Sequence, residues 1–177
     1  MIQVHDKRFR PFLVKETIQQ RVNAIAAQID EDYRGLDPLF IGILNGSFIF
    51  AADLFRALTI PAEISFVKLA SYKGTTSTGN VITAVGLDEN LTGRHIVIVE
   101  DIIDTGRTLA AFLPEIWQRQ PASIQIATFL RKPEALLHDV APAYVCFDIE
   151  NKFVVGYGLD YDGLGRQLPD LYVLAED

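Results

Sequence analysis

Residues 97–108 read VIVEDIIDTGRT, in which an apolar β-branched run leads into two adjacent carboxylates, Glu100 and Asp101. A third carboxylate, Asp104, follows before a short loop that contains glycine and threonine. A continuous apolar run is typical of a strand buried on both faces, as strands are in parallel sheets. The periodicity after the loop predicts a helix at about 108–118. The segment therefore predicts a strand–loop–helix unit of an α/β fold.

The loop that opens this helix has the residues of a phosphate site. The backbone N–H groups of 105–108, with the hydroxyls of Thr105 and Thr108, would form a concave set of donors at a helix N-terminus. Gly106 permits close approach of the backbone. The acidic residues before the loop suit sugar hydroxyls or a hydrated Mg²⁺. The alternative is that Asp104 or Thr105 only caps the helix and that the acids are solvated.

Apolar runs alternate with helical patterns along the rest of the chain. This alternation predicts an α/β fold with a mostly parallel sheet flanked by helices, and such sheets bind ligands beyond the carboxyl ends of their strands. Helices are expected at 15–29 and 48–58, and further strands at 39–44, 62–69, 81–85, 95–99, 123–130, 143–149, 153–156 and 171–174. A polar loop rich in glycine and threonine is expected at 71–80.

Composition excludes several classes of protein. The 177 residues are 49% hydrophobic, which suffices for the core of one domain, and the net charge of −7 disfavours nucleic-acid binding, which needs a basic face. The charged N-terminus lacks the apolar core of a signal peptide, and polar residues interrupt the most apolar stretch, 39–55. We therefore expect a cytoplasmic protein with no membrane partner. The single cysteine, Cys146, is expected to be a buried structural thiol.

The sequence VIVEDIIDTGRTL closely resembles the PRPP-binding motif of type I phosphoribosyltransferases, in the form found in hypoxanthine-guanine phosphoribosyltransferases; PRPP is phosphoribosyl diphosphate. The resemblance extends from about residue 10 to about 174. It is also carried by GILNGSFIFAADL (42–54), SYKGTTSTGNV (71–81), Lys132-Pro133 and KFVVGYGLDYDGLGRQLPDLYVL (152–174).

The resemblance implies the type I phosphoribosyltransferase fold in a single domain, residues 1–177. Its core would span about 36–150, and a small hood lobe would be built from about 1–15 and 151–177. The resemblance also implies Mg²⁺ as cofactor, PRPP and a 6-oxopurine base as substrates, and a homodimer or homotetramer as the assembly.

Roles for the residues of the motif follow from the same resemblance. Glu100 and Asp101 would hold the ribose hydroxyls, partly through Mg²⁺. Asp104 would be the general base, placed near N7 of the purine. The 5′-phosphate would be bound by the four residues that follow: Thr105, Gly106, Arg107 and Thr108.

The purine would be recognised by residues from two later segments. Lys132 would donate to the 6-oxo group, Phe153 would stack on the base, and the backbone of Val154 would meet the edge at the 2-position. Ser71 and Tyr72 would lie on a loop, 71–80, that closes over the site as a lid.

The diphosphate would be held from two sides. Asp160 would bind a Mg²⁺ shared with the diphosphate, and Arg166 would contact the diphosphate directly. On the other side lies a loop that contains a non-proline cis peptide in this family, formed here by Leu44, Asn45, Gly46 and Ser47. Many relatives carry a basic residue where Asn45 stands. Because backbone N–H groups would make most of these contacts, we expect activity to survive.

These roles together predict purine salvage: hypoxanthine or guanine and PRPP would give IMP or GMP and diphosphate. One alternative is a xanthine-preferring phosphoribosyltransferase. Another is a non-catalytic regulator of the same fold that senses PRPP or nucleotides. The regulator would need a basic surface or an added DNA-binding domain, whereas this chain is acidic and keeps Asp104.

Overall fold

The structure, a computed structural model, describes residues 1–72 and 81–175. Its larger sheet has six strands in the order β5-β4-β3-β6-β7-β8. Neighbouring strands are parallel except β4 and β5, which pair antiparallel at one edge. The predicted mostly parallel sheet is confirmed. The strands are β3 (Leu39–Leu44), β4 (Glu63–Tyr72), β5 (Val81–Val85), β6 (His95–Ile103), β7 (Ser123–Arg131) and β8 (Tyr144–Asp148).

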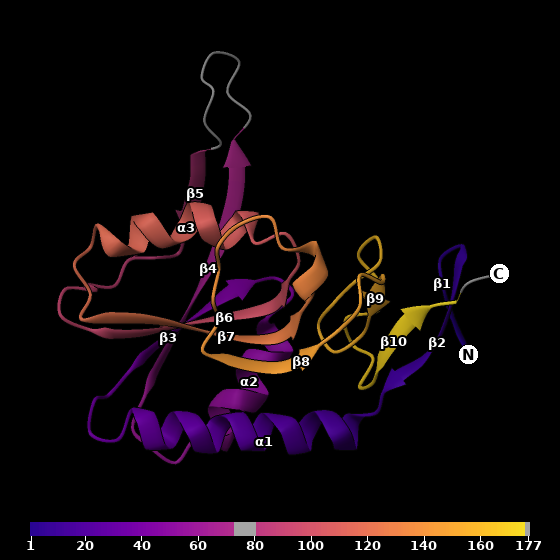
Figure 1. Ribbon diagram of the computed structural model, residues 1–177, viewed down its shortest axis with the longest axis horizontal. Coiled ribbons are helices and arrows are strands. Elements are labelled where there is room, and N and C mark those ends of the chain that lie inside the picture. Colours follow the sequence, from indigo (N-terminus) through magenta and orange to yellow (C-terminus); the bar gives the residue numbers. More distant parts are fainter. Residues whose placement is uncertain (73–80, 176–177) are drawn as a thin grey trace.

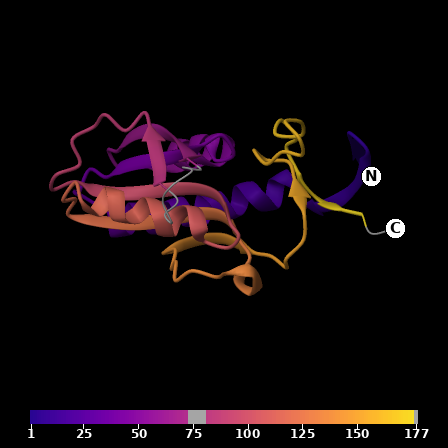
Figure 2. The same ribbon diagram turned by 90° about the horizontal axis from the view of Figure 1, so that it is seen from above.

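Helices cover both faces of this sheet (Figures 1 and 2). The first two helices, α1 (Lys15–Asp32) and α2 (Phe48–Ala57), pack on one face, and α3 (Arg107–Trp117) packs on the other. Side chains of β3 alternate between the two cores: Phe40 packs with α1 and α2, whereas its neighbour Ile41 packs in the cluster that contains α3. Two separate apolar cores thus hold the sheet between its helices.

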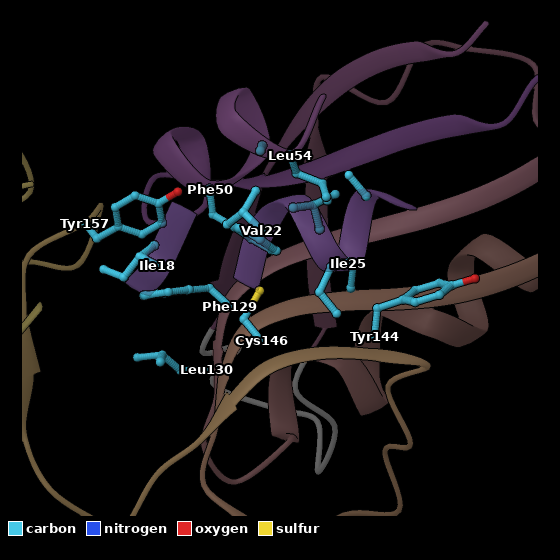
Figure 3. Close-up of a cluster of buried hydrophobic side chains, with 14 of the residues drawn as sticks. Ile18, Val22, Ile25, Phe50, Leu54, Phe129, Leu130, Tyr144, Cys146 and Tyr157 are labelled. Atoms are coloured by element: carbon cyan, nitrogen blue, oxygen red, sulfur yellow. The ribbon is translucent and has the colours of Figure 1, made fainter. Parts of the chain in front are cut away.

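The core under α1 and α2 is rich in aromatic and branched side chains (Figure 3). The helical repeat predicted from the sequence lies here, because Ile18, Val22, Ile25 and Ile29 are all fully buried. Cys146 of β8 lies in the same cluster and is 5% exposed. The thiol is therefore a buried core group, as predicted.

We expect Cys146 to resist thiol reagents in the folded protein. Burial raises the pKa of its thiol to about 12, and only the thiolate reacts, so about one thiol in 10⁴ is ionised at about pH 8. A chromogenic disulfide reagent should release no colour from the native chain and one equivalent after guanidinium denaturation. Rapid reaction of the native thiol would show that α1 does not seal this core.

A second, smaller sheet joins the two ends of the chain, beyond the edge of the larger sheet in Figure 1. Its strands pair antiparallel in the order β1-β2-β10-β9. Phe9, Val4 and Val155 form its apolar cluster. The strands are β1 (Ile2–Val4), β2 (Lys7–Leu13), β9 (Val154–Val155) and β10 (Leu171–Leu174).

Two predicted strand ends were wrong, and strand pairing explains the difference in both cases. β6 continues to Ile103 because its polar end stays paired with β7, so Glu100 and Asp101 lie within the strand rather than after it. β4 continues to Tyr72 because it pairs with β5, so Ser71 and Tyr72 are strand residues and not part of a loop. The rest of the expected lid, residues 73–80, lies outside the described residues.

Two helical details also differ from the prediction. α1 runs to Asp32, beyond the expected end at 29. A short 3₁₀ helix, η1 (Pro133–Ala135), follows β7 and was not expected. Among the described residues, no helix is both long and apolar enough to cross a membrane.

Candidate active site

Three neighbouring parallel strands, β3, β6 and β7, carry the candidate site at their carboxyl ends. The loop 45–47 follows β3, Asp104 follows β6, and Lys132 follows β7. Because these strands are adjacent in the sheet, segments that are far apart in sequence meet at one edge. The predicted location of the site is therefore supported by the order of the strands.

Glu100 and Asp101 form a buried acidic pair near the end of β6. Glu100 is 7% exposed, and Oε1 accepts the Asp101 N–H at 3.1 Å. Oδ1 of Asp101 accepts the Ile102 N–H at 2.8 Å. Burial raises the pKa of both carboxyls, and the charge of Asp101 raises that of Glu100 further. Burial thus destabilises the ionised form of both carboxyls, so the pair suits a bound cation or sugar hydroxyls.

The loop after β3 lies directly against this pair. The Leu44–Asn45 peptide is cis, as the family resemblance implied. A β-carbon at position 46 would overlap the carboxylate of Asp101, so the loop can approach only because Gly46 has no side chain. Ser47 is buried and its hydroxyl donates to the Ile43 carbonyl at 2.6 Å. Asp101 and the loop are thereby brought together.

The loop that opens α3 has the predicted concave form. Its N-cap is Gly106 in the left-handed region, with φ 79°, and this residue offers no capping side chain. Thr105 Oγ1 accepts the Arg107 N–H at 3.3 Å, but the alternative in which Asp104 caps the helix is wrong. The Thr105 carbonyl is held by two N–H groups, those of Leu137 at 3.0 Å and His138 at 3.2 Å. A concavity of about 90 Å³ is lined by Glu100 and residues 102–109.

Asp104 and Lys132 pair with each other across the ends of β6 and β7. Lys132 Nζ lies 3.2 Å from Asp104 Oδ2. The lysine side chain is 9% exposed, whereas that of Asp104 is 49% exposed. The Lys132 N–H donates to the Ile103 carbonyl at 2.9 Å, which fixes the start of the turn. A buried cationic donor thus stands beside an accessible carboxylate.

The segment after β9 contributes a second ion pair. Arg166 Nη2 lies 2.8 Å from Asp160 Oδ1, and Asp160 Oδ2 accepts the Gly163 N–H at 2.7 Å. Arg166 Nη1 also donates to the Gly158 carbonyl at 2.7 Å. The predicted residues Asp160 and Arg166 are therefore held together, and Gly158 carries them beside the loop after β3.

Phe153 and Val154 lie where the chain passes from β8 of the main sheet to β9 of the second sheet. Val154 is buried in β9, but Phe153 is 43% exposed. It meets Tyr161 edge-on, with ring centroids 5.7 Å apart, and Phe9 at 6.1 Å. Aromatic neighbours thus support the ring while leaving much of it accessible, as a stacking platform requires.

The acidic residues fit the magnesium ion that the family implies. Among the described residues, no cluster of three or more histidine, cysteine or acidic side chains could hold a metal alone. Magnesium, however, is usually bound by one or two carboxylates together with waters and substrate phosphates. The buried pair Glu100 and Asp101, and separately Asp160, offer such oxygen ligands.

Comparison with known proteins agrees with this geometry. Residues 14–162 match the phosphoribosyl transferase domain family. The hypoxanthine-guanine phosphoribosyltransferase of Streptococcus agalactiae serotype V is 42% identical over 164 residues, which cover 92% of this chain and 91% of that protein. The enzyme of the same name from Mycobacterium tuberculosis H37Rv is 42% identical over 163 residues, covering 88% and 81%.

Solved structures agree as well. A hypoxanthine-guanine phosphoribosyltransferase from Bacillus anthracis, with a HEPES molecule in its active site, superimposes with a TM-score of 0.88 at 34% identity, covering 96% of this chain and all of that one. The Trypanosoma cruzi hypoxanthine phosphoribosyltransferase gives 0.87 at 33% identity, covering 98% and 95%. This chain therefore belongs to the phosphoribosyltransferase family, in the group of the hypoxanthine-guanine phosphoribosyltransferases.

Proposed function

We propose that this transferase acts in purine salvage, moving the 5-phosphoribosyl group of PRPP to N9 of hypoxanthine or guanine and releasing diphosphate. The observation that carries the proposal is the Asp104–Lys132 pair, which stands beside a phosphate-type loop and a buried acidic pair. The names of the relatives favour this activity over a xanthine-preferring enzyme or a non-catalytic regulator.

Recognition of the base is assigned to three residues. Lys132 donates to the 6-oxo group and thereby selects against adenine, whose 6-amino group is itself a donor. Phe153 stacks on the ring, and the backbone of Val154 meets the edge at the 2-position. As N9 attacks C1 of the ribose, N7 becomes more acidic, and the accessible carboxylate of Asp104 takes its proton.

The sugar and its phosphates are assigned to the loops around β6 and β3. Thr105, Gly106, Arg107 and Thr108 hold the 5′-phosphate through N–H and hydroxyl donors. Glu100 and Asp101 hold the ribose hydroxyls, and their negative charge suits the positive charge that develops on the sugar. The diphosphate lies between Arg166 and the loop of Asn45, Gly46 and Ser47.

Magnesium would be held by Glu100 and Asp101 on one side and by Asp160 on the other. When bound, it neutralises the negative charge that gathers on the departing diphosphate. Ser71 and Tyr72, at the end of β4, would lead into the proposed lid, which would keep water from the reactive sugar.

The wider assignments also remain proposals. We infer a single domain, 1–177, with a core at about 36–150 and a hood from about 1–15 and 151–177; α1, between these ranges, packs on the main sheet. We infer a cytoplasmic homodimer or homotetramer that binds neither nucleic acid nor membrane. For the Trypanosoma cruzi protein, a role of the C-terminal region in oligomeric state and enzymatic activity has been described.

The test is an assay with four bases. The purified protein is incubated with PRPP and Mg²⁺ and, separately, with hypoxanthine, guanine, xanthine and adenine, and nucleotide formation is followed. IMP and GMP are expected, with no AMP. Preferred formation of XMP would establish the xanthine alternative, and absence of any nucleotide would refute the enzyme assignment.

A further inference from the structure

A partly buried hydrogen bond ties the segment that carries Asp160 and Arg166 to helix α2. The hydroxyl of Tyr157 donates to Asp53 Oδ2 at 2.7 Å, which joins residues 104 positions apart. Tyr157 is 5% exposed, and its ring packs on Phe129 with centroids 4.7 Å apart. Burial and the neighbouring Asp53 raise the pKa of the Tyr157 hydroxyl, so it stays protonated and remains a donor.

A second contact docks the same segment on the loop before α2. A β-carbon at position 158 would overlap the Gly46 carbonyl, so the two backbones meet closely at Gly158. Gly158 has φ 99°, and its N–H donates to the Arg166 carbonyl at 3.0 Å while its own carbonyl accepts from the Arg166 guanidinium. Any shift of position 158 relative to Gly46 therefore moves Arg166 as well.

The two contacts constrain the segment in different ways. The Gly46–Gly158 approach sets how near the backbones come, but this contact and the apolar packing of Tyr157 and Leu159 beside it have no fixed direction. The Tyr157–Asp53 hydrogen bond is directional and acts from the adjacent residue. The remaining bond of the Tyr157 backbone, from its N–H to the Leu168 carbonyl at 2.8 Å, stays within the segment. The hydroxyl thus supplies orientation against α2.

We propose that Tyr157 and Asp53 are positioning residues for PRPP: their hydrogen bond fixes residues 157–166 against the loop 45–47, so that Arg166 and Asp160 face the diphosphate. The inference rests on the proposed function of these two segments. Neither residue contacts the base in this scheme. Loss of the bond should therefore weaken PRPP and diphosphate binding and leave purine binding unchanged.

The test compares Tyr157→Phe with a matched tyrosine. Tyr144 is 6% exposed, and its hydroxyl donates to Asp32 Oδ2 on α1 at 2.5 Å. Figure 3 shows the two tyrosines at opposite ends of the same core. Both changes to phenylalanine remove one buried hydroxyl and keep the ring. The melting temperature is measured for each variant. Calorimetry in the presence of Mg²⁺ gives the Kd of PRPP and the Kd of inorganic diphosphate. The enzyme assay gives the KM of hypoxanthine.

Both variants should lose similar thermal stability, but only Tyr157→Phe should raise the Kd of PRPP and diphosphate, by about fivefold, as expected for one net hydrogen bond. The KM of hypoxanthine should stay within about twofold. Asp53→Ala should match Tyr157→Phe, and the double variant should be no worse than either. Asp53→Asn, which keeps an acceptor oxygen, should restore most of the affinity.

Two results would overturn the inference: an unchanged Kd in Tyr157→Phe, or an equal rise in Tyr144→Phe. Should Tyr157→Phe not fold, Asp53→Ala decides, because Asp53 is 25% exposed and lies on the surface side of α2. Failure of the proposed function looks different, since the unmodified protein would then form neither IMP nor GMP, whatever its affinity for PRPP.

Discussion

Asp104→Asn is expected to lower kcat by about 10²–10⁴-fold, the contribution typical of a positioned general base. The carboxamide has the same shape as the carboxylate and can still accept from Lys132, but it cannot take the proton from N7. The side chain is 49% exposed, so the substitution should cost little stability. PRPP affinity should stay within about twofold, because the phosphate donors follow at 105–108.

Single-turnover kinetics with hypoxanthine measure this effect, because they separate the chemical step from product release. Asp162→Asn is the matched control: Asp162 is exposed, and asparagine tolerates its left-handed φ of 51°. That variant should keep the rate of the unmodified protein. A single-turnover rate for Asp104→Asn above about a tenth of normal would contradict the general-base role.

The sequence predicted the main sheet and the location of the site because both depend on local patterns. The apolar run before Glu100 and the loop at 105–108 lie in one short stretch of sequence. The rule that ligands bind at the carboxyl ends of parallel strands then indicates where the other site residues lie. The ends of strands were less predictable. The strand was expected to end at 99, just before Glu100 and Asp101, yet both stay in β6 because the pairing of β6 with β7 continues to Ile103.

The second sheet could not be predicted in full because its pairing is long-range. In β2, KRFRPFL, only Phe9 is buried, so no alternating pattern marks a strand. Its partner β10 lies at the other end of the chain. The Tyr157–Asp53 bond was missed for the same reason, since nothing near either residue indicates the other. A glycine on each side of Tyr157 was the only local signal of close packing.

Lys132→Met should lower kcat/KM for hypoxanthine by about 10²-fold, the upper range for losing a charged hydrogen bond. Methionine keeps the length and apolar stem of the lysine, but it cannot donate to the 6-oxo group. It also leaves Asp104 without the cation that lies 3.2 Å away. Because the donor that opposes the 6-amino group disappears, the preference for hypoxanthine over adenine should shrink as well.

Steady-state assays with hypoxanthine and adenine measure both consequences in one variant. Lys15→Met is the control, since Lys15 is also ion-paired, to Glu16 at 3.9 Å, but starts α1 with its side chain 64% exposed. It should leave both rates unchanged. A loss of hypoxanthine activity without a change in the hypoxanthine-to-adenine ratio would mean that Lys132 acts only by orienting Asp104. A fall in hypoxanthine activity together with a fall in the hypoxanthine-to-adenine ratio would assign Lys132 to the 6-oxo group, because only a direct contact distinguishes a carbonyl from an amino group at that position.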